Sequence, residues 1–184
     1  SFTVGEVTGP GAAEFLQGLL ANDVDIPVGR VRYTPMLDEA GGILADLTVS
    51  RLDDERFLLL TGGGRSGSEQ LRWVREHAPT DGSVTVTDRT SGRCGLGVWG
   101  PKARETLADL VETDVSNDAF PYFGCRETYV GSVPVTMLRV SYVGELGWEL
   151  YAPMEYGAKL WDLVWEAGEE YEVIKEHPEI GGRI

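Results

Sequence analysis

The sequence VTGPGAAEFLQGL at residues 7–19 decides the fold, because a close copy of it, VWGPKARETLADL, occupies residues 98–110. At an offset of 91 residues (98 minus 7), the copies share Val, Gly, Pro, Ala, Glu and two Leu. Each copy reads as a strand, a Gly-Pro turn and a helix. The first helix has one apolar face, formed by Ala12, Phe15, Leu16, Leu19 and Leu20. The second helix repeats that face with Ala103, Leu107, Leu110 and Val111. The two copies indicate an internal duplication.

The duplication divides the chain into two similar halves, residues 1–91 and 92–184. The hydrophobic pattern predicts strands at 30–37, 42–52, 56–60 and 83–90 and helices at 66–78 and 156–168, whereas residues 173–184 have no strand pattern. Tight turns join successive strands, so we expect antiparallel pairing. The expected fold class is α+β, with two halves of mainly antiparallel sheet and helices packed on one face of each. Duplicated halves of this kind often enclose a ligand site between them.

The charge of the chain excludes two classes of partner. The 184 residues hold 30 acidic and 16 basic side chains, for a net charge of −14. Nucleic acids and anionic membrane surfaces need Lys or Arg to neutralise phosphate, so we expect neither as a partner. No apolar run approaches the roughly 20 residues of a membrane span. The chain starts without Met and is already strand-like, so we expect a piece of a longer protein.

The few cysteines and histidines predict a site without metal. Cys94 and Cys125 are far apart and match neither a zinc spacing nor a disulfide framework. His77 and His177 lie in charged surroundings near the ends of predicted helices. We therefore expect no metal centre and a reducing compartment, the cytoplasm.

A glycine motif offers one candidate site. Gly62, Gly64 and Gly67 fit the G-x-G-x-x-G spacing of a dinucleotide-binding turn. That motif needs parallel strands, and the strands before it are predicted to be antiparallel. The alternative is a connection capped by Ser66 or Ser68 at the start of a helix, and the pattern favours this alternative.

Two acids on predicted strands and turns offer a second candidate. In GGILADLTVSRL, the strand alternation places Asp46 with Thr48 and Ser50 on one face, and Ile43, Ala45, Leu47 and Val49 on the other. In VSYVGELGWELY at residues 140–151, Glu145 lies in a glycine-flanked turn between strands. Exposure to water would explain both acids. Asp is nonetheless rare in strands, and a fixed Glu fork matches a guanidinium or the N–H and NH₂ edge of an aminopyrimidinone ring.

These motifs carry a resemblance to a known family. The segments YTPMLDEAGGILADLTVSRL and GLGVWGPKARETLADL, followed by VSYVGELGWELY, resemble the aminomethyltransferase (glycine-cleavage T-protein) folate-binding family. The segments VSNDAFPYF, ADLTVSRL and VGELGWELY are most similar to the C-terminal folate domain of dimethylglycine and sarcosine dehydrogenases. The resemblance covers residues from about 4 to about 173, and the family's C-terminal part has no match in the chain.

The resemblance implies a function and a set of site residues. The family binds tetrahydrofolate in a central cavity and transfers a one-carbon unit to it from an amine donor. By match of motifs, Asp46 would be the catalytic carboxylate, while Glu145, Tyr33 and Tyr142 would bind the folate. The implied partners are folate, an N-methyl or aminomethyl donor and a flavin oxidoreductase domain or subunit, with FAD present only if a flavin domain precedes this segment. The alternative is a non-catalytic folate-binding or assembly module of a larger flavoprotein.

Overall fold

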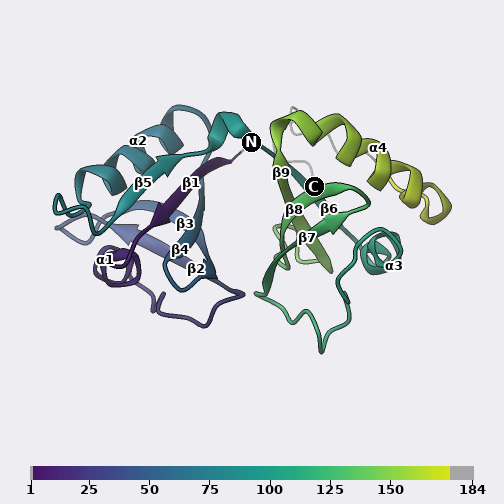
Figure 1. The fold of residues 1–184 in the computed structure, drawn as a ribbon, viewed down its shortest axis with the longest axis horizontal. Helices are drawn as coiled ribbons and strands as arrows, with labels where there is room; N and C mark the ends of the chain where they lie inside the picture. The colour runs from purple at the N-terminus through teal and green to yellow at the C-terminus, as the bar shows by residue number, and fades with distance from the viewer. Residues whose placement is uncertain (1, 175–184) are drawn as a thin grey trace.

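Two antiparallel sheets face each other, and the helices cover their outer faces (Figure 1). The structure, a computed structural model, describes residues 2–174. The first sheet has the strand order β2-β3-β4-β1-β5 and the second has the order β6-β9-β8-β7. The strands of the first sheet are β1 (Thr3–Thr8), β2 (Arg30–Leu37), β3 (Ile43–Asp53), β4 (Arg56–Thr61) and β5 (Thr85–Asp88). Those of the second are β6 (Arg93–Trp99), β7 (Cys125–Val130), β8 (Val133–Leu138) and β9 (Gly147–Pro153).

Each sheet packs its own pair of helices to make a hydrophobic core. The helices α1 (Ala12–Leu19) and α2 (Gly64–Glu76) cover the first sheet, and α3 (Ala103–Ala108) and α4 (Gly157–Gly168) cover the second. Short 3₁₀ turns lie at η1 (Thr90–Gly92), η2 (Met154–Tyr156) and η3 (Glu169–Tyr171). Phe57 on β4 and Trp148 on β9 are fully buried in the two cores. Among the described residues, no helix combines the length and the apolar character needed to cross a bilayer.

The fold class is confirmed, since the strands pair antiparallel throughout both sheets. The two sheets also share a strand order. The strands β1, β2, β3 and β4 correspond to β6, β7, β8 and β9. With this match the neighbouring strands follow the same spatial order in both sheets, and β5 is an additional strand at the edge of the first sheet. The division into domains at residues 91 and 92 stays a prediction.

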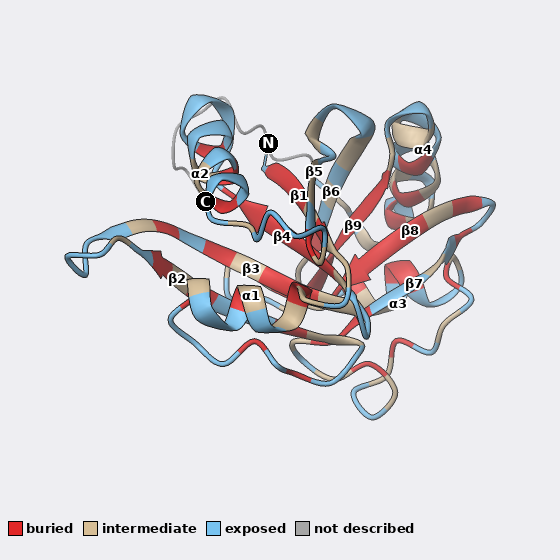
Figure 2. Cartoon of the chain, turned by 60° about the vertical axis from the view of Figure 1, so that its left-hand side comes forward, coloured by how far each residue is buried: buried red, intermediate tan, exposed pale blue. Residues whose placement is uncertain are grey.

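Two local predictions are wrong. The helix α2 begins at Gly64 with Gly63 at the cap position and has no side-chain cap, so neither Ser66 nor Ser68 caps it. The helix α3 ends at Ala108, because the chain then turns so that Val111 forms a β-bridge with Val130. Ile43, which shares a strand face with the buried Ala45, Leu47 and Val49, is itself 73% exposed. The hairpin of β2 and β3 extends beyond β4, and its tip lies in solvent (Figure 2).

A third hydrophobic cluster joins the two halves. It is formed by residues of both sheets: Val4, Val31, Leu58, Leu60, Cys125, Leu138, Val140 and Tyr151. Backbone hydrogen bonds of 2.8 Å, from Val31 N to Phe123 O and from Cys125 N to Gly29 O, cross the same junction. Arg56 and Glu127 add an ion pair from one half to the other. Because this cluster lies on the side of each sheet away from its helices, we call that side the inner face.

Candidate functional site

Asp46 lies on the inner face of the first sheet. Asp46, Thr48 and Ser50 alternate along β3 and therefore share a face. Ser50 is fully buried and pairs with Leu58 of β4, which belongs to the cluster that joins the halves. Ala45, Leu47 and Val49 are buried on the opposite side, against the helices. The carboxylate of Asp46 thus lies on the side of the sheet that the second half covers, at a point where the strand is still exposed.

The side chain of Tyr33 contacts Asp46. Tyr33 lies on β2 opposite Thr48, and its hydroxyl donates a hydrogen bond to Oδ2 of Asp46. This hydrogen bond raises the pKa of the Tyr33 hydroxyl above its usual value, so the tyrosine stays neutral and remains a donor at physiological pH. The Tyr33 ring is 51% exposed. The structure thus brings together two of the four predicted site residues.

Glu145 lies in the loop between β8 and β9. Gly144 before it has φ of +83°, which glycine adopts without strain, so the glycine makes the turn that presents Glu145 to solvent. Both ends of the loop are held at the end of β6. The indole Nε1 of Trp99 donates to Val140 O at 3.1 Å, and Gly100 N donates to Leu146 O at 2.8 Å. Tyr142, in the same loop, is 75% exposed.

The four predicted site residues form two pairs, one in each half of the chain. Tyr33 and Asp46 are joined by a hydrogen bond on the first sheet, and Glu145 and Tyr142 share one loop of the second half. The described hydrogen bonds and ion pairs include none between these pairs. The joint role of Asp46 and Glu145 therefore stays a prediction.

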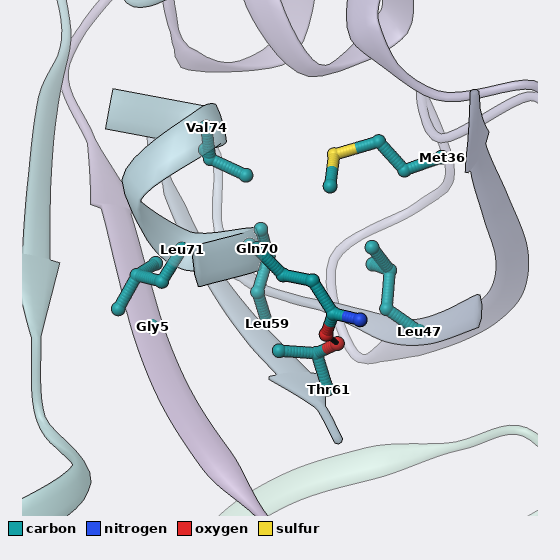
Figure 3. A pocket seen from close by; sticks show the side chains of 8 residues that line it. All are labelled: Gly5, Met36, Leu47, Leu59, Thr61, Gln70, Leu71 and Val74. Carbon is teal, nitrogen blue, oxygen red and sulfur yellow. Dashed lines mark hydrogen bonds between the residues drawn. The ribbon is translucent and has the colours of Figure 1, made fainter. Parts of the chain in front are cut away.

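Two hollows lie away from the predicted site residues. A cavity of about 10 Å³ beneath α2 is lined by apolar side chains such as Met36 and Leu47, with Thr61 and Gln70 at one end (Figure 3). That volume holds about one water molecule. A groove of about 250 Å³ lies at the junction of the halves, lined by Val28, Gly29, Leu52, Cys125, Arg126 and Glu127.

Glu149 and Tyr151 are polar residues of the inner face that the sequence predictions missed. Trp148, Leu150 and Ala152 of β9 are buried against α3 and α4, so the alternation puts Glu149 and Tyr151 on the inner face. The Tyr151 hydroxyl donates to Oε2 of Glu149 at 2.7 Å. The signal in the sequence was the acid in WELY, between residues typical of a buried strand.

The described residues gather no metal-binding set. No group of three or more His, Cys, Asp or Glu side chains comes together in residues 2–174. Cys94 and Cys125 are free thiols. Burial raises the pKa of the Cys125 thiol to about 12.

Comparisons with known proteins find relatives that agree with the family model. The family model of the GCVT N-terminal domain matches residues 1–176. Mitochondrial dimethylglycine dehydrogenase of Homo sapiens is 39% identical over 165 residues, which are 89% of this chain and 19% of that protein. The aminomethyltransferase of Thermoanaerobacter pseudethanolicus is 34% identical over 171 residues, 91% of this chain and 46% of that protein.

A solved structure has the same fold. The aminomethyltransferase T of the glycine cleavage system from Bartonella henselae matches with a TM-score of 0.74 and 26% identity, over 89% of this chain and 43% of that chain. The chain thus spans about a fifth of the length of the human dehydrogenase and less than half the length of the two aminomethyltransferases.

Proposed function

The chain belongs to the GCVT N-terminal domain family, and we propose that it binds tetrahydrofolate and transfers a one-carbon unit to it. The donor is an N-methyl or aminomethyl amine, as in the aminomethyltransferases and dimethylglycine dehydrogenase that the chain resembles. The observation that carries the proposal is the Asp46 carboxylate, held by the Tyr33 hydroxyl on the inner face of the first sheet.

The residues present fit a pterin ring. A pterin carries an N–H and an NH₂ group on one edge, and a carboxylate accepts both through parallel hydrogen bonds. Glu145 is exposed on a loop whose turn is fixed by Gly144 and whose ends are held by Trp99 and Gly100. We assign Glu145 to this edge and Tyr142, in the same loop, to the folate-binding set.

Asp46 is the proposed proton acceptor. When bound, the folate supplies a nucleophilic ring nitrogen, which loses a proton as it takes up a carbon unit. A carboxylate near that nitrogen can accept the proton and stabilise positive charge on the amine donor. The hydroxyl of Tyr33 binds Oδ2 of Asp46 and so keeps the carboxylate in one orientation. The other oxygen of Asp46, Oδ1, then accepts the proton from the folate.

The partners of the domain follow from this chemistry. An N-methyl donor has to be oxidised before its carbon can be transferred, so such a donor implies a flavin enzyme with FAD in a domain or subunit outside this chain. An aminomethyl donor needs no such oxidation. The cytoplasmic location stays a prediction, and one relative, the human dehydrogenase, is named as mitochondrial.

Binding and transfer can be tested separately with two substitutions. Calorimetry with 5-formyltetrahydrofolate, a stable folate, should give binding that weakens by at least about tenfold in Glu145→Ala, because the loss of even one hydrogen bond to a charged group costs about 1.5–3 kcal/mol and a tenfold change is about 1.4 kcal/mol. Asp46→Ala should bind within about threefold of the unchanged protein and lose one-carbon transfer. Glu166→Gln, at an exposed position of α4, is the matched control. Unchanged binding by Glu145→Ala removes the proposed ring contact, and equal transfer by Asp46→Ala removes Asp46 from the mechanism.

A further inference from the structure

The site residue Tyr33 depends on the backbone of β2 for its position. Its ring is half-exposed, so packing in a core does not hold it. Its hydroxyl has to reach Asp46 diagonally, from a position opposite Thr48. Because a hydrogen bond weakens steeply when its geometry is disturbed, a change in the path of β2 would weaken the contact between the hydroxyl and the carboxylate.

Within residues 2–174, β2 is an edge strand of its sheet. It pairs with β3 along one side, and the strand order places no strand on the other side. Alternate residues of an antiparallel strand direct their backbone groups to the same side. On β2 the backbone groups of Val31, Tyr33 and Pro35 face away from β3, and they need partners from outside the sheet.

Backbone groups fill two of these three positions. Val31 N donates to Phe123 O, in the second half, at 2.8 Å, and Ala21 N donates to Pro35 O at 3.1 Å. The position between them is that of Tyr33. The partner at Tyr33 therefore decides whether the edge of β2 is closed where the strand carries the site residue.

Asn22 is the partner at that position. Its Nδ2 donates to the Tyr33 carbonyl at 2.8 Å, and its own backbone N donates to Oγ1 of Thr34 at 3.0 Å. Asn22 thus binds two successive residues of β2, one through its side chain and one through its main chain. Asn22 is exposed, so its side chain does not fill a core.

The segment that carries Asn22 is fixed on both sides. Leu20, two residues earlier, is buried and forms a β-bridge with Met36. Val24, two residues later, is fully buried, and its backbone N donates to Oε1 of Gln17 on α1 at 2.8 Å. A fixed segment therefore presents the Asn22 amide, which holds the strand instead of following it.

We propose that Asn22 is a positioning residue, whose amide holds the backbone of β2 at Tyr33 so that the Tyr33 hydroxyl keeps the Asp46 carboxylate in its orientation. The inference rests on the proposed one-carbon transfer, in which Asp46 accepts a proton. The described hydrogen bonds of Asn22 go to β2 and not to Asp46, so Asn22 acts through Tyr33. A residue that only covers a strand edge would change stability without a specific effect on Tyr33.

A double-mutant cycle tests whether Asn22 acts through Tyr33. Asn22→Ala should slow one-carbon transfer about three- to fivefold and change folate affinity by less than about twofold, because it moves the hydroxyl without touching the ligand. In the Tyr33→Phe protein the same substitution should slow transfer by less than about 1.5-fold, since no hydroxyl is left to position. Glu166→Gln, at an exposed position of α4, is the control and should leave both rates unchanged.

Nuclear magnetic resonance follows the hydrogen bond between Tyr33 and Asp46 without any folate. With carbon-13 at Cζ of the tyrosines, the Tyr33 signal is the one that Tyr33→Phe lacks, and its place in Asp46→Ala marks a hydroxyl without its acceptor. In Asn22→Ala the signal should move at least about a quarter of the way to that place. Thr34→Val removes the acceptor of Asn22 N and should move the signal in the same direction, whereas Glu166→Gln should leave it unmoved.

The outcomes separate this inference from the function on which it rests. Thermal unfolding shows that each variant is folded at the temperature of the measurement. A Tyr33 signal that stays in place in Asn22→Ala, or an equal slowing of transfer by this substitution with and without the Tyr33 hydroxyl, overturns the positioning role and leaves the folate function intact. Absence of folate binding and transfer in the unchanged protein overturns the proposed function, and the Tyr33 signal then still decides whether Asn22 holds this residue.

Discussion

The hydroxyl of Tyr33 donates a hydrogen bond to the carboxylate of Asp46, from strand β2 to strand β3. Tyr33 is directly opposite Thr48, so the bond runs diagonally to the next residue on the same face. Both side chains are exposed, and neither is needed to fill a core. Packing of a core therefore does not account for the pair, and a role of both residues in the proposed reaction stays a prediction.

Replacement of Tyr33 by Phe should separate orientation from binding. The ring would remain while the hydrogen bond to Asp46 is lost, so we expect one-carbon transfer to slow by about tenfold and folate affinity to change by less than about threefold. Steady-state kinetics and calorimetry measure the two effects. Tyr129→Phe, an exposed tyrosine of β7, is the control and should leave both unchanged. Transfer at the full rate in Tyr33→Phe would contradict an orienting role.

Replacement of Leu138 by Ala should weaken the junction between the halves. Leu138 is fully buried in the cluster that residues of both sheets form. Loss of a buried leucine side chain costs about 2–5 kcal/mol in the free energy of unfolding, and urea denaturation measures this value. Leu37→Ala, at an exposed position on β2, should change stability by less than about 1 kcal/mol. Equal effects of the two substitutions would show that the cluster does not stabilise the fold.

Cys125 should be an unreactive thiol. Burial raises its pKa to about 12, so at about pH 8 roughly one molecule in 10⁴ carries the reactive thiolate. In a Cys94→Ser variant, Ellman's reagent should therefore modify Cys125 only as fast as the protein opens, and rapidly in concentrated urea. Rapid modification of the native variant would contradict the burial of Cys125 at the junction.

The stability of the protein should carry a signature of Glu149. Its pKa is raised in the folded protein above the ordinary value of 4.5, so the folded state binds this proton more tightly than the unfolded state does. The contribution of Glu149 to the free energy of unfolding therefore falls as pH rises through 4.5 toward the folded pKa. Urea denaturation should show Glu149→Gln gaining stability relative to the unchanged protein as pH rises over this window. A difference that is independent of pH would show that Glu149 ionises as freely as in the unfolded chain.

Much of the fold could be predicted from local pattern. The repeated strand, Gly-Pro turn and helix placed α1 and α3, and the tight turns around β3 gave the antiparallel pairing. The family resemblance is also confirmed, by the match to residues 1–176. Ile43 is exposed although it alternates with buried residues of β3, because strand alternation gives the face of a residue and not whether the neighbouring strand reaches that far.

The candidate site was only partly predictable. Asp46 and Glu145 were predicted from motifs, and their role stays a prediction. The hydrogen bond between Tyr33 and Asp46 follows from the register of β2 and β3, which the sequence does not specify. Glu149 was missed because one acid within a strand reads as a solvated residue. Its burial is a property of the tertiary structure, for which the local sequence carries no signal.

The central claim is that the inner faces of the two halves bind folate through Asp46 and Glu145. A crystal structure of the protein with bound 5-formyltetrahydrofolate tests this claim most directly. We expect the pterin edge within hydrogen-bond distance of the Glu145 carboxylate, with Asp46 and Tyr33 facing the ring nitrogens. A ligand seated in the groove lined by Val28 and Cys125, with Asp46 and Glu145 both in water, would contradict the account.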